Sequence, residues 1–250
     1  GATSTLGATS LCSAHNRRWG PEVAIHRDFE LVLEVDDVLW AQGADPAKIR
    51  SRSPLLVEVA ERALAGGLPL LRPAVLYSEF DVEGLTHERL SLAGGGALSG
   101  PLIRQHLASV SRVVVTVCTI GPELEARVAQ TMGSDFQYAL ALDGVVSAAA
   151  EALATAVCHQ FEVESENEGR GTTTRISPGM VGWPVSEGQQ QLFALVNSEE
   201  IGVTLLPTGM MMPRKSLTQV IGRGRDVSAD GEPCDYCSMG ERCLYRSRLR

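Results

Sequence analysis

The sequence predicts an α+β protein in which helices pack on a mixed or antiparallel sheet. Apolar residues recur at helical spacing over residues 28–67, whereas residues 73–85 and 112–120 are rich in β-branched and aromatic side chains, as strands are. An alanine-rich run over residues 138–161 is apolar nearly all round, which is typical of a central helix packed closely on a sheet. Helices and strands thus follow each other in blocks, without the regular βαβ alternation of a parallel sheet.

Composition and charge narrow the class of protein. The chain has 250 residues, of which 44% are hydrophobic, enough for the core of one large domain, and its net charge of -8 argues against a nucleic-acid binder. The most apolar run, residues 138–161, is interrupted by Asp143 and Glu151, so no membrane span is predicted. The N-terminus has no signal-peptide pattern, and the uneven spread of the six cysteines favours a cytoplasmic setting over a secreted disulfide framework.

The first third of the chain is predicted to be helical. Residues 28–43 carry apolar side chains at helical spacing and stop at a glycine, and residues 44–67 read as one or two further helices that end at a glycine pair. Asp45 is a suitable N-cap and Pro46 fits the first helical position.

The middle of the chain is predicted to alternate between sheet and helix. Strands over residues 73–85 and 112–120 flank the glycine-rich segment 93–107, and a short helix follows over residues 121–132. The glycine-rich segment is predicted to form a hairpin turn and a helix from Pro101. A phosphate-binding loop is disfavoured because no strand–glycine–helix register with a following lysine is present.

The last third is predicted to return to strands and to end in a tail. Residues 201–222 contain two strand-like segments around a methionine-rich corner, after which the chain becomes polar and glycine-rich. The expected division is a flexible lead-in over residues 1–27, a single domain over residues 28–225 and a cysteine-rich tail over residues 226–250.

Residues 172–191, TTTRISPGMVGWPVSEGQQQ, combine a fixed cation, a rigid corner and a large aromatic side chain. Arg175 offers a planar fork suited to a carboxylate. Pro178 restricts the backbone, and Gly179 lets the chain approach a ligand without a Cβ in the way. The spacing alone favours an Arg175 that pairs with a neighbouring acid beside a plain turn, because R-x-x-P-G also occurs by chance.

Several motifs resemble the activation domain of cobalamin-dependent methionine synthase, and especially its short stand-alone relatives. The likeness covers about residues 28–225 and is most specific over residues 172–222. The motifs that carry it are TIGPELE (119–125), RISPG (175–179), GWP (182–184), the glutamines at 189–191, IGVTL (201–205) and MMPRKSLTQVIG (211–222).

The resemblance implies a domain that binds S-adenosylmethionine and supports reductive reactivation of an oxidised corrinoid. In that family the arginine grips the ligand carboxylate and the turn backbone meets the adenosyl part. Carried over to this chain, the ligand-binding positions are Arg175, Ser177, Pro178, Gly179, Met180 and Trp183. The family commonly has Gly-Tyr at the turn, whereas here Met180 follows Gly179, so the role of the tyrosine ring is lost or is supplied by Trp183. Trp183 would then contact the sulfonium by a cation–π interaction of roughly 0.5–2 kcal/mol; the alternative is a core tryptophan.

The corrinoid is expected to arrive on a separate protein, because the chain lacks the Asp-x-His-x-x-Gly pattern of cobalt ligation. The expected partners are therefore a corrinoid protein or methyltransferase, with a ferredoxin or flavodoxin as electron donor. Asp143 and Glu151, eight residues apart on roughly one helical face, are candidates for neutralising the ammonium or sulfonium, or for pairing with buried polar groups.

The tail sequence CDYCSMGERC carries three closely spaced thiols, Cys234, Cys237 and Cys243. Soft thiolates favour a metal, with an iron–sulfur cluster ahead of zinc. A fourth ligand would have to be exogenous or come from elsewhere in the chain, for which the candidates are Cys12, Cys118, Cys158 and His15. The alternatives are free thiols or a redox-active pair of Cys234 and Cys237.

The leading function is therefore S-adenosylmethionine-dependent methylation, and thereby reactivation, of a corrinoid on another protein. Two alternatives from other classes stay open. One is an enzyme that cleaves S-adenosylmethionine at an iron–sulfur cluster by radical chemistry, although the chain lacks the usual C-x3-C-x2-C spacing for it. The other is a non-catalytic module that binds S-adenosylmethionine or the corrinoid protein.

Overall fold

The structure is a computed structural model that describes residues 23–243 and residue 246. Most of the predicted lead-in, residues 1–27, falls outside the described residues, and so do the candidate metal ligands Cys12 and His15.

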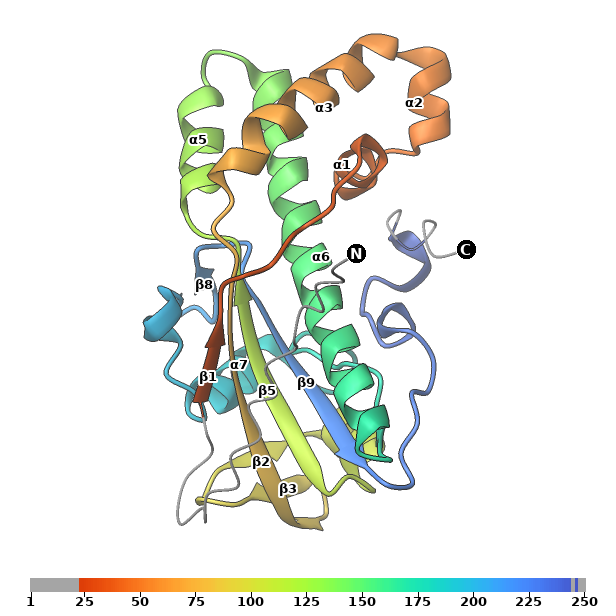
Figure 1. Cartoon of the computed structure of the whole chain (residues 1–250), viewed down its shortest axis with the longest axis vertical. Coiled ribbons are helices and arrows are strands. Elements are labelled where there is room, and N and C mark those ends of the chain that lie inside the picture. Colours follow the sequence, from red (N-terminus) through yellow and green to blue (C-terminus); the bar gives the residue numbers. More distant parts are fainter. Residues whose placement is uncertain (1–22, 244–245, 247–250) are drawn as a thin grey trace, which may run out of the picture.

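An antiparallel sheet runs through the molecule (Figure 1). Its strand order is β4-β3-β2-β5-β9-β6, and β1 also pairs with β2. The long strand β2 pairs with β5 along one edge, while its other edge pairs first with β1 and then with β3. The strands are β1 (Val23–His26), β2 (Ala74–Thr86), β3 (Arg89–Leu92), β4 (Ala97–Ser99), β5 (Arg112–Thr119), β6 (Gly171–Thr172) and β9 (Leu217–Gly224), and a separate hairpin contains β7 (Thr204–Leu205) and β8 (Met211–Met212).

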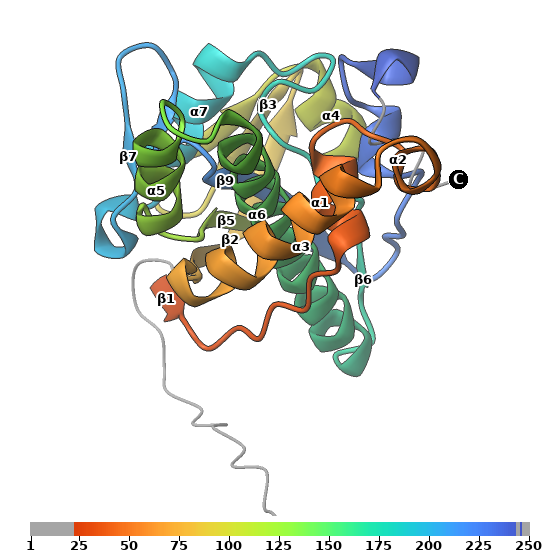
Figure 2. The same ribbon diagram turned by 90° about the horizontal axis from the view of Figure 1, so that it is seen from above.

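Helices extend beyond one end of the sheet (Figure 1), and seen from that end they lie over it (Figure 2). The longest helix is α6. One part of it contacts α1, α3 and α5 in a helical layer, and another part packs on β5 and β9 of the sheet. The α-helices are α1 (Val35–Ala41), α2 (Pro46–Arg52), α3 (Pro54–Gly67), α4 (Pro101–Leu107), α5 (Glu123–Thr131), α6 (Phe136–Asn167) and α7 (Val185–Phe193). This arrangement confirms the predicted α+β class.

The sheet separates two hydrophobic clusters. Successive side chains of a strand point to opposite faces, and β5 shows this directly. Val114 and Cys118 belong to the cluster under α6, whereas Val113, Val115 and Val117 belong to the cluster on the opposite face. Because β5 is buried on both faces, its sequence is a continuous apolar run rather than an alternating one.

The long helix α6 has the length and hydropathy that a membrane span needs, but 61% of its apolar 18-residue stretch is buried inside the protein. It is thus packed largely as a core helix.

Most of the predicted elements are present, but the first helix was placed wrongly. Residues 27–34 form no helix, and α1 begins only at Val35, where the Asp37 carboxylate accepts the N–H of Glu34 at 2.8 Å. Phe29, Leu31 and Leu33 pack against the core from an irregular segment. Their spacing of two residues fits an extended chain, although the apolar pattern of residues 28–43 predicted a helix there.

The cap of the second helix is as predicted. Pro46 stands at the start of α2, and the Asp45 carboxylate accepts the backbone N–H groups of Ala47 and Lys48 at 3.0 and 3.3 Å. An N-cap of this kind satisfies donors that have no partner inside the helix.

Gly144 allows α1 and α6 to approach closely. A Cβ at this position would lie 2.8 Å from Cγ of Gln42 and 2.9 Å from the carbonyl oxygen of Val38. We expect Gly144→Ala to lower the free energy of unfolding by about 1–3 kcal/mol, because the overpacking outweighs the helix propensity gained. Chemical denaturation measures this change. Gly133→Ala is the matched control, since its Cβ would meet nothing within 4 Å, and an equal loss in both variants would contradict the packing argument.

Candidate functional site

Arg175 lies between the short strand β6 and the turn at Pro178, on the face of the sheet that α6 covers. Its side chain is only 15% exposed and forms an ion pair with the Glu151 carboxylate of α6. Burial alone would lower the pKa of Arg175, but the Glu151 carboxylate and the nearby thiols of Cys158 and Cys118 together raise it above its usual value. The guanidinium therefore stays charged inside the protein.

Gln219 of β9 fixes the orientation of this arginine. Its Oε1 accepts a hydrogen bond from Arg175 at 3.2 Å, and its Nε2 donates to the carbonyl oxygen of Ala154 at 3.1 Å. Gln219 is almost fully buried, between Leu217 and Ile221 on the face of β9 toward α6. A polar side chain in that apolar row was the signal in the sequence that this residue holds a buried polar group.

A cavity of about 680 Å³ lies next to the Arg175–Glu151 pair. Roughly 300–1,000 Å³ is the usual size of a small-molecule site. Apart from Arg175 and His159, the titratable groups in its wall are carboxylates and thiols. The carboxylates are Asp37, Glu151, Glu162 and Glu232, and the thiols are Cys158 and Cys234. The cavity is thus acidic around one fixed cation.

The predicted turn has the backbone expected of it. Gly179 has φ of 100°, a value that disfavours any residue with a Cβ, and its N–H donates to the carbonyl oxygen of Trp183 at 2.7 Å. Met180, at the position where the family commonly has tyrosine, folds back so that its Sδ accepts the N–H of Ser177 at 3.4 Å. The cavity wall includes Arg175 but not the turn residues 177–180.

Trp183 lies in the core, the second of the two roles that its sequence allowed. It has no exposed surface, belongs to the cluster opposite α6 and donates from Nε1 to Oε1 of Gln191 at 3.3 Å. It is also absent from the wall of the cavity beside Arg175. The structure therefore offers no ligand a free face of this indole.

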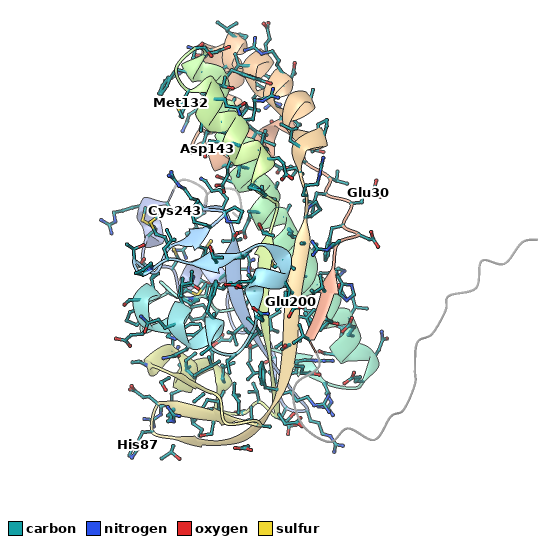
Figure 3. All side chains as sticks on the ribbon, turned by 90° about the vertical axis from the view of Figure 1, so that its left-hand side faces the viewer. Glu30, His87, Met132, Asp143, Glu200 and Cys243 are labelled. Atoms are coloured by element: carbon teal, nitrogen blue, oxygen red, sulfur yellow. The ribbon has the colours of Figure 1, made fainter. Side chains whose placement is uncertain are left out.

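Asp143 and Glu151 do not share a site, although both lie on α6. Asp143 accepts a hydrogen bond from Nζ of Lys215 at 3.2 Å and borders a separate groove beside Met132, nearer the helical end of the molecule (Figure 3). Only Glu151 lies beside Arg175.

The first part of the tail, residues 230–237, lies across the turn, and we call it the strap. The hydroxyl of Thr174 donates hydrogen bonds to the carbonyl oxygens of Asp230 and Gly231 in the strap, at 3.0 and 2.9 Å. The Tyr236 carbonyl oxygen accepts a hydrogen bond from the N–H of Val181 at 2.9 Å. The strap also supplies the cavity wall at residues 231–234. Strap, turn and cavity are therefore contiguous. In Figure 1 the strap is part of the blue C-terminal segment beside α6.

The thiols of the tail lie close enough to influence one another. Burial raises the pKa of the Cys234 thiol, and the neighbouring thiols of Cys237 and Cys243 raise it further. All three are free thiols, and among residues 23–243 and 246 no three potential ligands are grouped as a metal site. The expected iron–sulfur or zinc site is therefore not formed by the described residues as they stand.

Of the two other described cysteines, Cys118 is buried in the core and Cys158 is partly buried in the cavity wall. Burial raises the pKa of Cys118 to about 12 and that of Cys158 to about 11. Neither is placed as a fourth ligand for the tail in the described part of the chain.

Among solved structures, this fold is similar to that of the MetH reactivation domain bound to AdoHcy, with a TM-score of 0.60. The superposed parts cover 83% of this chain and 80% of that chain. The chain has the fold of a MetH reactivation domain. The sequence identity is 12%, so the likeness to the MetH reactivation domain concerns the fold. No family profile and no curated protein sequence matches the chain.

Proposed function

We propose that the chain binds S-adenosylmethionine in the cavity beside Arg175. The observation that carries this proposal is a single buried guanidinium in a wall with four carboxylates. S-adenosylmethionine has one carboxylate, one ammonium and one sulfonium, so the ligand needs one cation and several anions from the protein. A fold shared with a domain that is bound to AdoHcy supports the same assignment.

The Arg175–Glu151 pair would receive the amino-acid end of the ligand. A guanidinium and a carboxylate side by side match an α-carboxylate and an α-ammonium. The pair is closed in the structure, so binding requires the ligand carboxylate to take a place on Arg175 that Glu151 now holds. Because Glu151 is 33% exposed, its carboxylate has room to turn toward the ammonium.

We further propose that the bound methyl donor serves the reactivation of a corrinoid on a separate protein. An inactive, oxidised corrinoid is hard to reduce, and methyl transfer from a sulfonium is strongly favourable, so methylation would trap the reduced form. The chain's own contribution would be to hold the sulfonium methyl in position. A ferredoxin or flavodoxin is the expected class of electron donor, and the proposed setting is cytoplasmic.

An assay with the anaerobically purified full chain tests this function. We expect calorimetry to detect S-adenosylmethionine binding, and we expect methylation of an added Co(II) corrinoid protein when an electron donor is present. Binding without methylation would favour a non-catalytic module, and formation of 5′-deoxyadenosine would favour radical chemistry. No binding of S-adenosylmethionine would refute reactivation and radical chemistry, and would leave only a module that binds the corrinoid protein.

A metal on the tail thiols is a finer proposal, which rests on the C-x2-C-x5-C spacing. Because no metal-binding group is formed among the described residues, the proposed function does not depend on a metal. Metal analysis of the anaerobically prepared protein tests it. Stoichiometric iron and sulfide, lost on Cys234→Ala, would establish the site.

A further inference from the structure

The two cysteines of the strap lie against the two parts of the candidate site. Cys234 lines the cavity beside Arg175, whereas Cys237 forms a β-bridge with Met180 of the turn. The hydrogen bond from Val181 to Tyr236 holds strap and turn together next to that bridge. Any change that links Cys234 to Cys237 therefore acts on the cavity and on the turn at once.

The backbone already holds these cysteines close together. The N–H of Cys237 donates to the carbonyl oxygen of Cys234 at 3.4 Å, and both side chains are free thiols. The first and fourth Cα atoms of such a turn lie within about 7 Å of each other. A disulfide needs roughly 4.4–6.8 Å between its two Cα atoms, so the bridge requires a rotation of the side chains and little movement of the backbone.

We propose that Cys234 and Cys237 form a reversible disulfide that lowers the affinity of the Arg175 cavity for its ligand. The oxidant is a low-molecular-weight disulfide. A protein thiolate attacks one of its sulfurs and releases one small thiol, after which the second cysteine displaces the other small thiol and closes the protein S–S bond. Two electrons and two protons pass from the cysteines to the small disulfide, which becomes two thiols.

The coupling follows from the position of Cys234. Bridging joins the sulfur of Cys234, a residue of the cavity wall, to that of Cys237, which pairs with Met180 of the turn. The part of the wall that Cys234 forms is thereby altered, and the strap is constrained. By linkage, a bound ligand makes the same disulfide easier to reduce. The change in affinity rests on the proposed function, whereas formation of the bridge does not.

The test uses the full chain, purified anaerobically with its metal content measured, in a reduced form and after treatment with oxidised glutathione. Mass spectrometry is expected to show the loss of two hydrogens, located in the peptide that contains Cys234 and Cys237. Calorimetry is expected to show that the Kd for AdoHcy is at least roughly 5-fold higher for the oxidised protein. This factor is the lower end of the usual range of allosteric coupling. A metal held by these thiols, no bridge between them, or equal or tighter AdoHcy binding after oxidation would overturn the proposal.

Two variants locate the effect. Cys237→Ser is expected to abolish the dependence on oxidation, and Cys243→Ser, outside the strap, is expected to retain it. If neither form of the protein binds AdoHcy, the proposed ligand is wrong. Hydrogen exchange at the Val181 amide then shows whether oxidation changes the contact between the strap and the turn. An exchange rate that changes on oxidation supports a redox-dependent strap, and an unchanged rate refutes it.

Discussion

Arg175→Ala is expected to weaken S-adenosylmethionine binding by roughly 2–5 kcal/mol, the usual effect of truncating one partner of a buried charged pair. This corresponds to about 30-fold to several-thousand-fold in Kd. The physical reason is that the ligand carboxylate would enter an acidic cavity whose fixed cation is gone, against the carboxylates of Glu151 and its neighbours. Calorimetry with the reduced protein measures the change.

The matched control for this change is Arg170→Ala. Arg170 lies five residues earlier and pairs with Glu168 at 3.5 Å, but it is not part of the cavity wall. Thermal unfolding of both variants shows whether Arg175→Ala is still folded, since it leaves Glu151 without its partner. A folded Arg175→Ala protein that binds S-adenosylmethionine as the unchanged protein does would remove the proposed site.

Trp183→Ala is expected to lower the free energy of unfolding by about 3–5 kcal/mol, as large-to-small changes in a core do. The indole has no exposed surface, and a Cβ at Gly188 would lie only 2.9 Å from its ring, so the space around it is closely filled. The loss also leaves Oε1 of Gln191 without one of its two donors. Urea denaturation followed by circular dichroism measures the effect.

A second variant separates the two roles that the sequence allowed Trp183. Trp183→Phe keeps an aromatic ring and much of the volume, so a core residue would retain the fold and the ligand affinity. If this variant is as stable as the parent but loses S-adenosylmethionine binding, the ring contacts the ligand and the assignment to the core is wrong.

The sequence was most informative for elements that depend on residues close together in the chain. Asp45 and Pro46 start α2 as predicted because capping depends on residues within one turn. The β-branched run at residues 112–119 forms the strand β5, which is buried on both faces. The aromatic and β-branched residues in the first half of β2 likewise form a buried strand. The segment that contains Phe29, Leu31 and Leu33 was misassigned because three apolar residues also fit part of a helical pattern.

The candidate site was less predictable, because its contacts join segments far apart in sequence. The sequence predicted Arg175 as a fixed cation for a ligand carboxylate, but it could not show that its partners Glu151 and Gln219 come from α6 and β9. Periodicity says that a residue faces the core, but not which residue it meets there. The approach of the strap to the turn depends on Thr174 and on backbone groups of Val181 and Tyr236, and backbone groups leave no trace in a sequence.

The cavity beside Arg175 is assembled from both ends of the described chain. Val32 and Leu33 line it from the N-terminal side, and residues 229–234 line it from the C-terminal side. During synthesis on the ribosome this cavity is therefore incomplete until Cys234 has emerged. Any ligand of this cavity can therefore stabilise the folded chain only after that point.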